Sequence, residues 1–518
     1  MSAPPLSLLH AVEPWIVSEP DREAIVFGDT RLTYAGLAAH ACGLANHLQA
    51  LGVQPGERIG LLCTPRPEGI IAFLAAWLIG ATVAGITPRL KRAEQAAILK
   101  DCDCRVLIAI RQEGTRALDA DLDHHEQALG ISTLRIGREF ASEGWLRPIG
   151  AAAIAACWDE ALDRFDPATP AVVIYTSGST GKPKGALISH AGLAFRAWTI
   201  HQDRFPLPHI RQLIDIPINH IGALASGVGV SLVAGGLMVL AEQFDPAYTL
   251  AVTARERLQV LSGVPPMLAR LADLPAFATA DLSSVAYVTW GAGPLPARVI
   301  DALLARTKAH LSQQYGMTET NGPIVYTPLT RDHDTLLGTT GKPDPRLEVR
   351  IADACDRPVD AGVEGEVQVR QPYPFMGYLG DPVATAAVLT ADGFLRTGDR
   401  ALLRDDGYLV FKGRSKEMFK SGGFNVYPRE VEILLESHPA VRAAAVLGID
   451  DEAWGQTGHA FVELQSPAEP DDLIAWCKER LANYKVPKAI TVIAAMPRTS
   501  VDKVDRMALQ RKLTEPQA

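Results

Sequence analysis

A run rich in glycine, hydroxyl and lysine side chains lies between two apolar segments, and it limits what the chain can fold into. The run covers residues 175–185 and reads Tyr-Thr-Ser-Gly-Ser-Thr-Gly-Lys-Pro-Lys-Gly, with apolar residues 171–174 before it and 186–188 after it. Glycine lets backbone N–H groups approach an anion closely, hydroxyls donate to phosphate oxygens, and lysine supplies positive charge. The sequence therefore predicts a polyphosphate-binding loop that joins two strands.

The spacing within this loop excludes a Walker A motif. That motif needs four residues between its first glycine and its Gly-Lys pair, followed by a helix that holds the phosphate. Here only Ser179 and Thr180 separate Gly178 from the Gly-Lys pair, and Pro183 disfavours a helix at this point. A surface turn would explain the glycines but not this order of hydroxyls and lysines.

Size and charge narrow the class of protein. The chain has 518 residues, too many for one hydrophobic core, so we expect two or more domains. Apolar residues make up 47% and charged residues 21%, which is typical of a soluble globular protein. The net charge of −9, without a basic run, argues against a nucleic-acid partner.

Neither the cysteines nor the apolar stretches indicate an exported or membrane protein. The seven cysteines are scattered, odd in number and without a Cys-x-x-Cys pair, which favours reduced thiols in a cytoplasm. Residues 1–17 lack the pattern of a secretory signal. Residues 69–86 and 221–241 are uncharged and long enough to cross a membrane, but glycines interrupt both. Each is predicted to be a buried helix, a turn and a buried strand, so we expect no membrane span.

The N-terminal part alternates predicted strands and helices. Residues 24–27 and 31–33 flank a Gly-Asp turn as a hairpin. Thr33 can cap a helix whose apolar residues recur every three or four positions until Gly52 ends it, and residues 58–62 form the next strand. Such alternation predicts α/β layers with parallel sheet.

The pattern changes near residue 405, after which a turn and a short strand lead to a polar segment. We predict a domain boundary at Lys416, which divides the chain into residues 1–415 and 416–518. The second part is predicted to be a small α+β unit, with strands over 441–447 and 459–464 and a helix over 471–481.

Seven segments resemble the motifs of the adenylate-forming (AMP-binding) superfamily, in its acyl-CoA synthetase/ligase branch and in that family's order. The phosphate loop is the first, and the other six are residues 219–222, 290–294, 314–319, 397–399, 421–424 and 497–503. The resemblance covers nearly the whole chain. It implies a large α/β N-terminal domain of doubly wound sheets with a small β-barrel-like part, followed by a small mobile α+β C-terminal domain.

The resemblance also implies an ATP site. The residues expected around the phosphates are Thr176, Ser177, Gly178, Ser179, Thr180, Gly181 and Lys184. Those expected around the adenine are Gly291, Ala292, Gly293, Gln314, Tyr315 and Gly316, with the tyrosine ring stacked on the base.

Four further residues would complete this site by resemblance. Thr318 would contact the α-phosphate and Glu319 would hold Mg²⁺, which prefers hard oxygen ligands and takes few protein carboxylates. Asp399 would accept both ribose hydroxyls, since a carboxylate has two acceptor oxygens for a vicinal diol. Arg414 would contact ribose and phosphate.

The acid-binding residues implied are His220, Trp290, Met317 and Val264. His220 would lie beside the substrate carboxylate, although an isolated histidine is more often part of a core. Trp290 stands where the family commonly has a small residue, and it could either narrow the acid pocket or pack in the core. No lysine or arginine in these segments would pair with a second carboxylate, so we expect an aromatic or medium aliphatic monocarboxylic acid.

The C-terminal motifs imply a moving domain. Lys416 matches the hinge, and Gly422 and Gly423 match a segment that lines the tunnel for the CoA thiol, although they could also form a plain surface loop. Lys503 matches the lysine that contacts the reacting carboxylate and the α-phosphate. Asp502 stands where the family usually has glycine, and Asp tolerates the left-handed backbone region better than most residues.

The activity implied is an ATP-dependent acid–thiol ligase that forms an acyl-adenylate and then a CoA thioester. An enzyme that loads a carrier-protein thiol is the first alternative, because both acceptors present a pantetheine arm. A non-catalytic nucleotide-binding protein is the second. The joint presence of Glu319, Asp399, Arg414 and Lys503 disfavours it. The sequence makes no prediction of oligomeric state.

Overall fold

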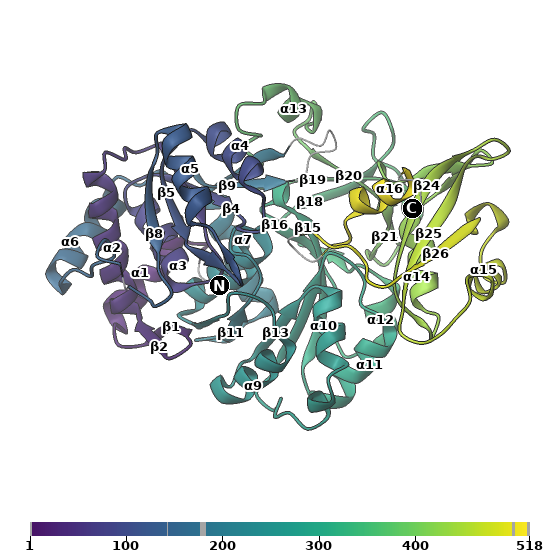
Figure 1. Cartoon of the computed structure of the whole chain (residues 1–518), viewed down its shortest axis with the longest axis horizontal. Helices are drawn as coiled ribbons and strands as arrows, with labels where there is room; N and C mark the ends of the chain where they lie inside the picture. The colour runs from purple at the N-terminus through teal and green to yellow at the C-terminus, as the bar shows by residue number, and fades with distance from the viewer. Residues whose placement is uncertain (1–2, 142, 177–182, 500–502, 515–518) are drawn as a thin grey trace.

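The computed structural model describes residues 3–141, 143–176, 183–499 and 503–514. Its N-terminal part holds two large, mainly parallel sheets, a smaller antiparallel sheet and a two-stranded hairpin of β6 (Gln112–Glu113) and β7 (Arg116–Ala117). Its C-terminal part holds a further sheet with helices beside it (Figure 1). The predicted fold class is confirmed.

A six-stranded sheet carries the predicted phosphate loop at its edge. Its strands are, in spatial order, β10 (Lys184–Ser189), β9 (Pro170–Thr176), β4 (Thr82–Ile86), β3 (Arg58–Leu62), β5 (Cys104–Ile110) and β8 (Ser132–Ile136). All neighbours pair in parallel except β9 and β10, which form an antiparallel hairpin. The predicted strands on either side of the loop are therefore confirmed.

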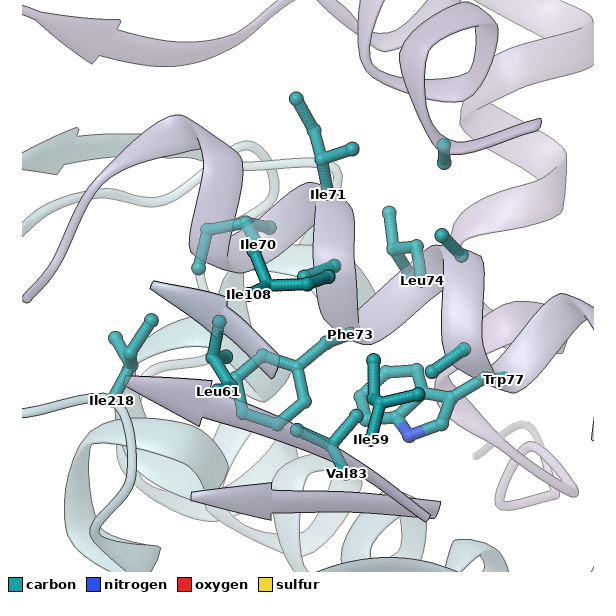
Figure 2. Close-up of a cluster of buried hydrophobic side chains, with 14 of the residues drawn as sticks. Ile59, Leu61, Ile70, Ile71, Phe73, Leu74, Trp77, Val83, Ile108 and Ile218 are labelled. Carbon is teal, nitrogen blue, oxygen red and sulfur yellow. The ribbon is translucent and has the colours of Figure 1, made fainter. Parts of the chain in front are cut away.

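Helix α3 (Pro67–Leu78) is buried along its whole length against this sheet. Figure 2 shows Phe73 and Trp77 of α3 lying over Ile59, Leu61 and Val83 of the strands. A left-handed turn at Gly80 then leads into β4. The first uncharged stretch is thus the buried helix, glycine turn and buried strand that the sequence predicts.

A nine-stranded sheet forms the second layer. Its spatial order is β17 (Lys342–Pro343), β16 (Gly322–Tyr326), β15 (His310–Met317), β14 (Tyr287–Gly291), β13 (Val260–Gly263), β11 (Arg211–Ile214), β12 (Leu237–Leu240), β1 (Glu23–Phe27) and β2 (Thr30–Thr33). The strands from β15 to β1 run parallel, and the outer strands are antiparallel. The predicted hairpin at the N-terminus is confirmed as β1 and β2.

Helices cover both sheets. Thr33 caps α2 by accepting a hydrogen bond from the Gly36 N–H, as predicted, and Gly52 follows the end of that helix with φ +85°. The helices of the N-terminal part are α1 (Leu8–Ser18), α2 (Tyr34–Ala50), α3, α4 (Arg92–Cys102), α5 (Asp119–Leu129), α6 (Ala151–Asp163), α7 (His190–Arg204), α8 (Val230–Ala234), α9 (Pro246–Glu256), α10 (Pro265–Ala272), α11 (Ala297–Arg306), α12 (His333–Gly338) and α13 (Pro382–Ala387).

The second uncharged stretch is also interior structure. A π-helix (Gly222–Gly229) runs into α8, a left-handed Gly235 ends that helix, and the chain enters β12. Within the part of the chain that the structure describes, no helix is both long and apolar enough to cross a membrane.

The expected barrel-like part is a four-stranded antiparallel sheet. Its strands are β18 (Glu348–Ala352), β19 (Gly365–Arg370), β20 (Leu395–Leu403) and β21 (Leu409–Arg414). The hydrophobic cluster on this sheet includes Ile324 and Val325 of β16, so it packs directly on the nine-stranded sheet.

The C-terminal part has its own core. Its elements are β22 (Phe419–Ser421), β23 (Phe424–Val426), α14 (Pro428–Glu436), β24 (Val441–Asp451), β25 (Gly455–Leu464), α15 (Pro470–Lys478), β26 (Ala489–Ile493) and α16 (Arg506–Thr514). The main hydrophobic cluster here draws its buried members from residues 419–490. Lys416 lies in the turn just before β22. β24 and β25 are longer than the predicted strands because they continue as one antiparallel hairpin to the pair Asp451–Gly455.

Candidate active site

The carboxyl ends of neighbouring parallel strands bring most predicted acid- and adenine-binding residues to one edge of the nine-stranded sheet. Val264 directly follows β13, Gly291 ends β14 and Met317 ends β15, while His220 lies in the segment after β11. Ligands of open α/β sheets bind at this edge. Sheet topology therefore gathers residues that are far apart in the sequence.

The predicted phosphate loop connects β9 to β10. Thr176 and Lys184 face each other as the last pair of this hairpin. The predicted contacts Ser177, Gly178, Ser179, Thr180 and Gly181 lie outside the described residues.

Tyr378, which the sequence analysis missed, joins this hairpin to Glu319. The backbone around Tyr378 extends the sheet beyond β10, since Leu187 N donates to Gly377 O at 3.0 Å. The Lys184 Nζ lies 5.1 Å from the centroid of the Tyr378 ring. The Tyr378 hydroxyl donates to Glu319 Oε1 at 2.8 Å. The end of the phosphate loop and the predicted metal ligand therefore meet at one tyrosine.

Glu319 is a buried carboxylate held in a tight turn after β15. It belongs to the short 3₁₀ helix Thr318–Thr320, and its side chain is 5% exposed with Thr318 also buried. Thr320 Oγ1 accepts from Met317 N at 2.9 Å and fixes the start of this turn. Tyr378 occupies one carboxylate oxygen, and no hydrogen bond from any described residue reaches Oε2. This oxygen fits the hard ligand that Mg²⁺ prefers.

Asp399 is the most deeply buried carboxylate of the site, with 3% of its surface exposed. The Tyr315 hydroxyl donates to its Oδ2 at 2.8 Å, and Arg414 Nε lies 3.2 Å from its Oδ1. Among the described residues, Oδ1 still receives no hydrogen bond of proper geometry. Burial raises the Asp399 pKa, and the Arg414 charge opposes this shift. The orphaned acceptor fits the donor that a ribose hydroxyl supplies.

The predicted adenine segment has constrained backbone. A Cβ at Gly291 would lie 3.3 Å from the carbonyl oxygen of Gln314 on β15. Ala292 has φ +68°, a left-handed conformation that is rare for a residue other than glycine. Such strained positions cluster at ligand-binding sites. A Cβ at Gly316 would lie 2.3 Å from Gly322 O, so β15 requires glycine there.

Lys503 comes from the C-terminal part and lies among these groups. Its side chain keeps access to solvent, yet the surrounding protein lowers its pKa, and the Arg414 charge adds to this effect. The carboxylates of Asp399 and Glu319 act in the opposite direction. Lys503 N donates a hydrogen bond to Thr499 Oγ1 at 3.3 Å. Asp502 lies outside the described residues.

His220 is held neutral. Burial lowers its pKa to about 4, and the Lys503 charge contributes to this shift. Its Nδ1 accepts from Gly222 N at 3.3 Å, which orients the ring. A neutral imidazole beside a lysine can donate a hydrogen bond to a carboxylate without competing for its charge.

Comparison with known families agrees with this arrangement. The model of the family "AMP-binding enzyme" matches residues 12–379, and that of the "AMP-binding enzyme C-terminal domain" matches residues 430–503. The chain belongs to the AMP-binding enzyme family. A feruloyl-CoA synthase from Amycolatopsis is 34% identical over 95% of this chain and 96% of its own length. An indoleacetate–CoA ligase from Aromatoleum aromaticum is 34% identical over 94% of each chain.

A solved structure of the same family shares the complete architecture. The o-succinylbenzoate CoA synthetase from Bacillus subtilis, in complex with its acyl-adenylate intermediate, superimposes with a TM-score of 0.81. It is 27% identical in sequence and covers 99% of both chains. Both parts of this AMP-binding enzyme therefore have counterparts in one known protein.

Three predicted residues of this AMP-binding enzyme have surroundings that explain them structurally. Trp290 is 0% exposed and belongs to a hydrophobic cluster with Leu261 and Val299, which is the packing alternative. Gly422 and Gly423, with φ +56° and +84°, form the two-residue turn between β22 and β23. Positive φ at both positions is the type I′ geometry, which favours glycine, so the turn alone accounts for both glycines.

Proposed function

We propose that this AMP-binding enzyme is an ATP-dependent acid–thiol ligase that converts a monocarboxylic acid into its CoA thioester, with AMP and pyrophosphate as products. One observation carries the proposal: Tyr315 and Arg414 both contact the buried Asp399 carboxylate, at 2.8 Å and 3.2 Å. The charges of Asp399, Arg414 and Glu319 also act on the pKa of Lys503 from the C-terminal part. The relatives named above as CoA ligases support it.

In the first half-reaction a carboxylate oxygen of the acid attacks the α-phosphorus of ATP, and pyrophosphate leaves. Both reactants are negatively charged, so the site must offset repulsion as the bond forms. Lys503 and Lys184 supply positive charge, and neutral His220 orients the acid. Mg²⁺, held by Glu319, would neutralise charge on the phosphate oxygens. Asp399 and Tyr315 hold the nucleoside.

In the second half-reaction the CoA thiol attacks the acyl carbon and AMP leaves. Lys503 is not needed to stabilise charge in this step, so the C-terminal part is free to pivot at Lys416. The pivot would present the β22–β23 turn with Gly422 and Gly423 to the thiol. Carrier-protein loading would use the same chemistry, but the named relatives favour CoA.

The acid proposed is an aromatic or medium aliphatic monocarboxylate. The predicted pocket segments carry no lysine or arginine for a second carboxylate. The names of two relatives, a feruloyl-CoA synthase and an indoleacetate–CoA ligase, point to aromatic acids.

Pyrophosphate release over a panel of aryl, short, medium and long acids, with and without CoA, tests the proposal. We expect acid-dependent pyrophosphate release and, with CoA, a thioester that mass spectrometry detects. Pyrophosphate release that no carboxylic acid stimulates would exclude the ligase. Thioester formation on a phosphopantetheinyl carrier protein but not on CoA would reassign the acceptor.

A further inference from the structure

A tyrosine of the C-terminal part reaches back to the small antiparallel sheet of the N-terminal part. Tyr427 directly precedes α14 and is 7% exposed. Its hydroxyl donates a hydrogen bond at 2.6 Å to Oε1 of Glu364, the residue just before β19. Because the two residues lie on opposite sides of Lys416 in the chain, this contact joins the two parts between which the pivot is proposed.

The acceptor of this hydrogen bond is itself held in place. Arg400 Nε donates to the same Glu364 oxygen at 3.2 Å, and both side chains are about two-thirds buried. A hydrogen bond to an ionised acceptor is shorter and stronger than one between neutral groups. Burial raises the Tyr427 pKa and the bond to Glu364 adds to this shift, so the hydroxyl keeps its proton and acts as the donor.

The Tyr427 ring also packs against the sheet. A Cβ added to Gly413 of β21 would lie 2.9 Å from Tyr427 Cδ1, so the glycine leaves the space that the ring fills. α14, which follows the tyrosine, lies against β21 (Figure 1). Packing and hydrogen bonding therefore both favour this arrangement of the two parts.

The contact lies one residue pair away from the nucleoside site. In the hairpin of β20 and β21, Asp399 pairs with Arg414, and Arg400 pairs with Gly413. The first pair carries charges that act on Lys503, and the second pair lies against the tyrosine. The C-terminal part therefore meets adjacent pairs of one hairpin through its lysine and its tyrosine.

A pivot at Lys416 would break this contact. Tyr427 follows Val426, a buried member of the hydrophobic cluster of the C-terminal part, and so moves with that part. Its hydrogen-bond acceptor and the glycine under its ring belong to the N-terminal part. The contact is therefore specific to the arrangement that brings Lys503 to the nucleoside site, here called the adenylating arrangement.

We propose that Tyr427 is a positioning residue that stabilises the adenylating arrangement through Glu364 and so opposes the pivot towards thioester formation. The inference rests on the proposed function, which supplies the two half-reactions. It goes beyond that function because it assigns part of the balance between them to one hydrogen bond.

The ratio of the two half-reaction rates measures this role. Each half-reaction proceeds from its own arrangement, so each observed rate scales with the fraction of enzyme in that arrangement. The rate of thioester formation divided by that of adenylation is therefore inversely proportional to the equilibrium constant that favours the adenylating arrangement. A loss of folded enzyme lowers both rates equally and leaves the ratio unchanged.

Tyr427→Phe removes the hydroxyl and keeps the ring on Gly413. We expect the ratio to rise about 3- to 10-fold, as for the loss of one partly exposed hydrogen bond. Adenylation is measured as single-turnover pyrophosphate release at saturating ATP, with the acid that the panel above selects. Thioester formation is measured from the supplied acyl-adenylate of that acid and CoA.

Tyr408→Phe is the matched control. Tyr408 directly precedes β21, its ring contacts Lys342 of the same part, and no described residue accepts a hydrogen bond from its hydroxyl. The ratio should therefore change by less than about twofold in this variant.

The acceptor tests the same contact from the other part. Glu364→Ala should raise the ratio in the same direction as Tyr427→Phe, although the two residues lie in different parts. The double variant should raise the ratio by less than the product of the two single effects, because both remove one interaction.

Each outcome supports or overturns the inference. A ratio that rises by less than about threefold in Tyr427→Phe, or that falls, would overturn it and leave the ligase standing. Single effects that multiply in the double variant would do the same. No acid-dependent pyrophosphate release from the unmodified enzyme would refute the proposed function, and the inference with it.

Discussion

The Tyr378 hydroxyl orients the Glu319 carboxylate through a hydrogen bond, and its contribution to Mg²⁺ binding can be tested without changing the carboxylate itself. Tyr378→Phe removes one hydroxyl and leaves the aromatic ring beside Lys184 in place. The lost contact is a 2.8 Å hydrogen bond to a buried carboxylate, worth about 1.5–3 kcal/mol. Residues that orient a metal ligand typically contribute about 10- to 100-fold to metal affinity or activity. We expect apparent Mg²⁺ affinity to fall by about that factor.

The assay is acid-dependent pyrophosphate release at saturating ATP over a range of Mg²⁺ concentrations. Tyr373→Phe is the matched control, because no described residue bonds the Tyr373 hydroxyl and only its backbone carbonyl is used, by Asn321. The double variant with Glu319→Gln should lose less than the sum of the two single effects, since both act on one contact.

An unchanged Mg²⁺ dependence in Tyr378→Phe, within twofold of the unmodified enzyme, would refute this reasoning. So would additive losses in the double variant. Either result would mean that Glu319 is oriented by its backbone turn alone.

Three further predictions concern Lys503, the backbone at Gly316 and the buried His190. Lys503→Ala should slow adenylation by about two to four powers of ten, the effect of a lost preorganised charge, and should leave thioester formation from supplied acyl-adenylate nearly unchanged; equal slowing in single-turnover assays of each step would contradict this. Gly316→Ala should weaken ATP binding and lower the melting temperature because its Cβ would meet Gly322 O at 2.3 Å, whereas Gly338→Ala, with open space around it, should do neither. Burial lowers the His190 pKa to about 3, below its unfolded value near 6.5, so the folded state loses stability as pH falls from 6.5 towards 3. Denaturant unfolding of His190→Leu should show a slope shallower by up to about 1.4 kcal/mol per pH unit in that range, and an unchanged slope would refute this.

Local patterns predicted much of the fold because the interactions that form those elements are themselves local. The strand Arg58–Leu62 has the predicted bounds, and the α2 cap at Thr33 needs only the next three residues. The uncharged stretch after residue 69 could be assigned to the interior because Gly80 marks a turn that a membrane helix would not contain.

Residues whose roles depend on distant pairing could not be predicted in this way. Tyr378 reaches Glu319 only because its backbone pairs with β10, a strand nearly two hundred residues earlier. A tyrosine after a glycine has no distinctive sequence signal. Trp290 was ambiguous because a strand next to a ligand site has one face in the core.

The position of β1 in the nine-stranded sheet bears on how the chain is made in the cell. β1 pairs with β12 through Ile25 and Met238, so β1 leaves the ribosome long before its partner strand is synthesised. Until then its unpaired edge can associate with any other nascent chain that offers a strand. A chain truncated before residue 237 is therefore expected to need a chaperone to avoid aggregation. A chain that ends after β12 contains the strand that pairs with β1 and should aggregate less.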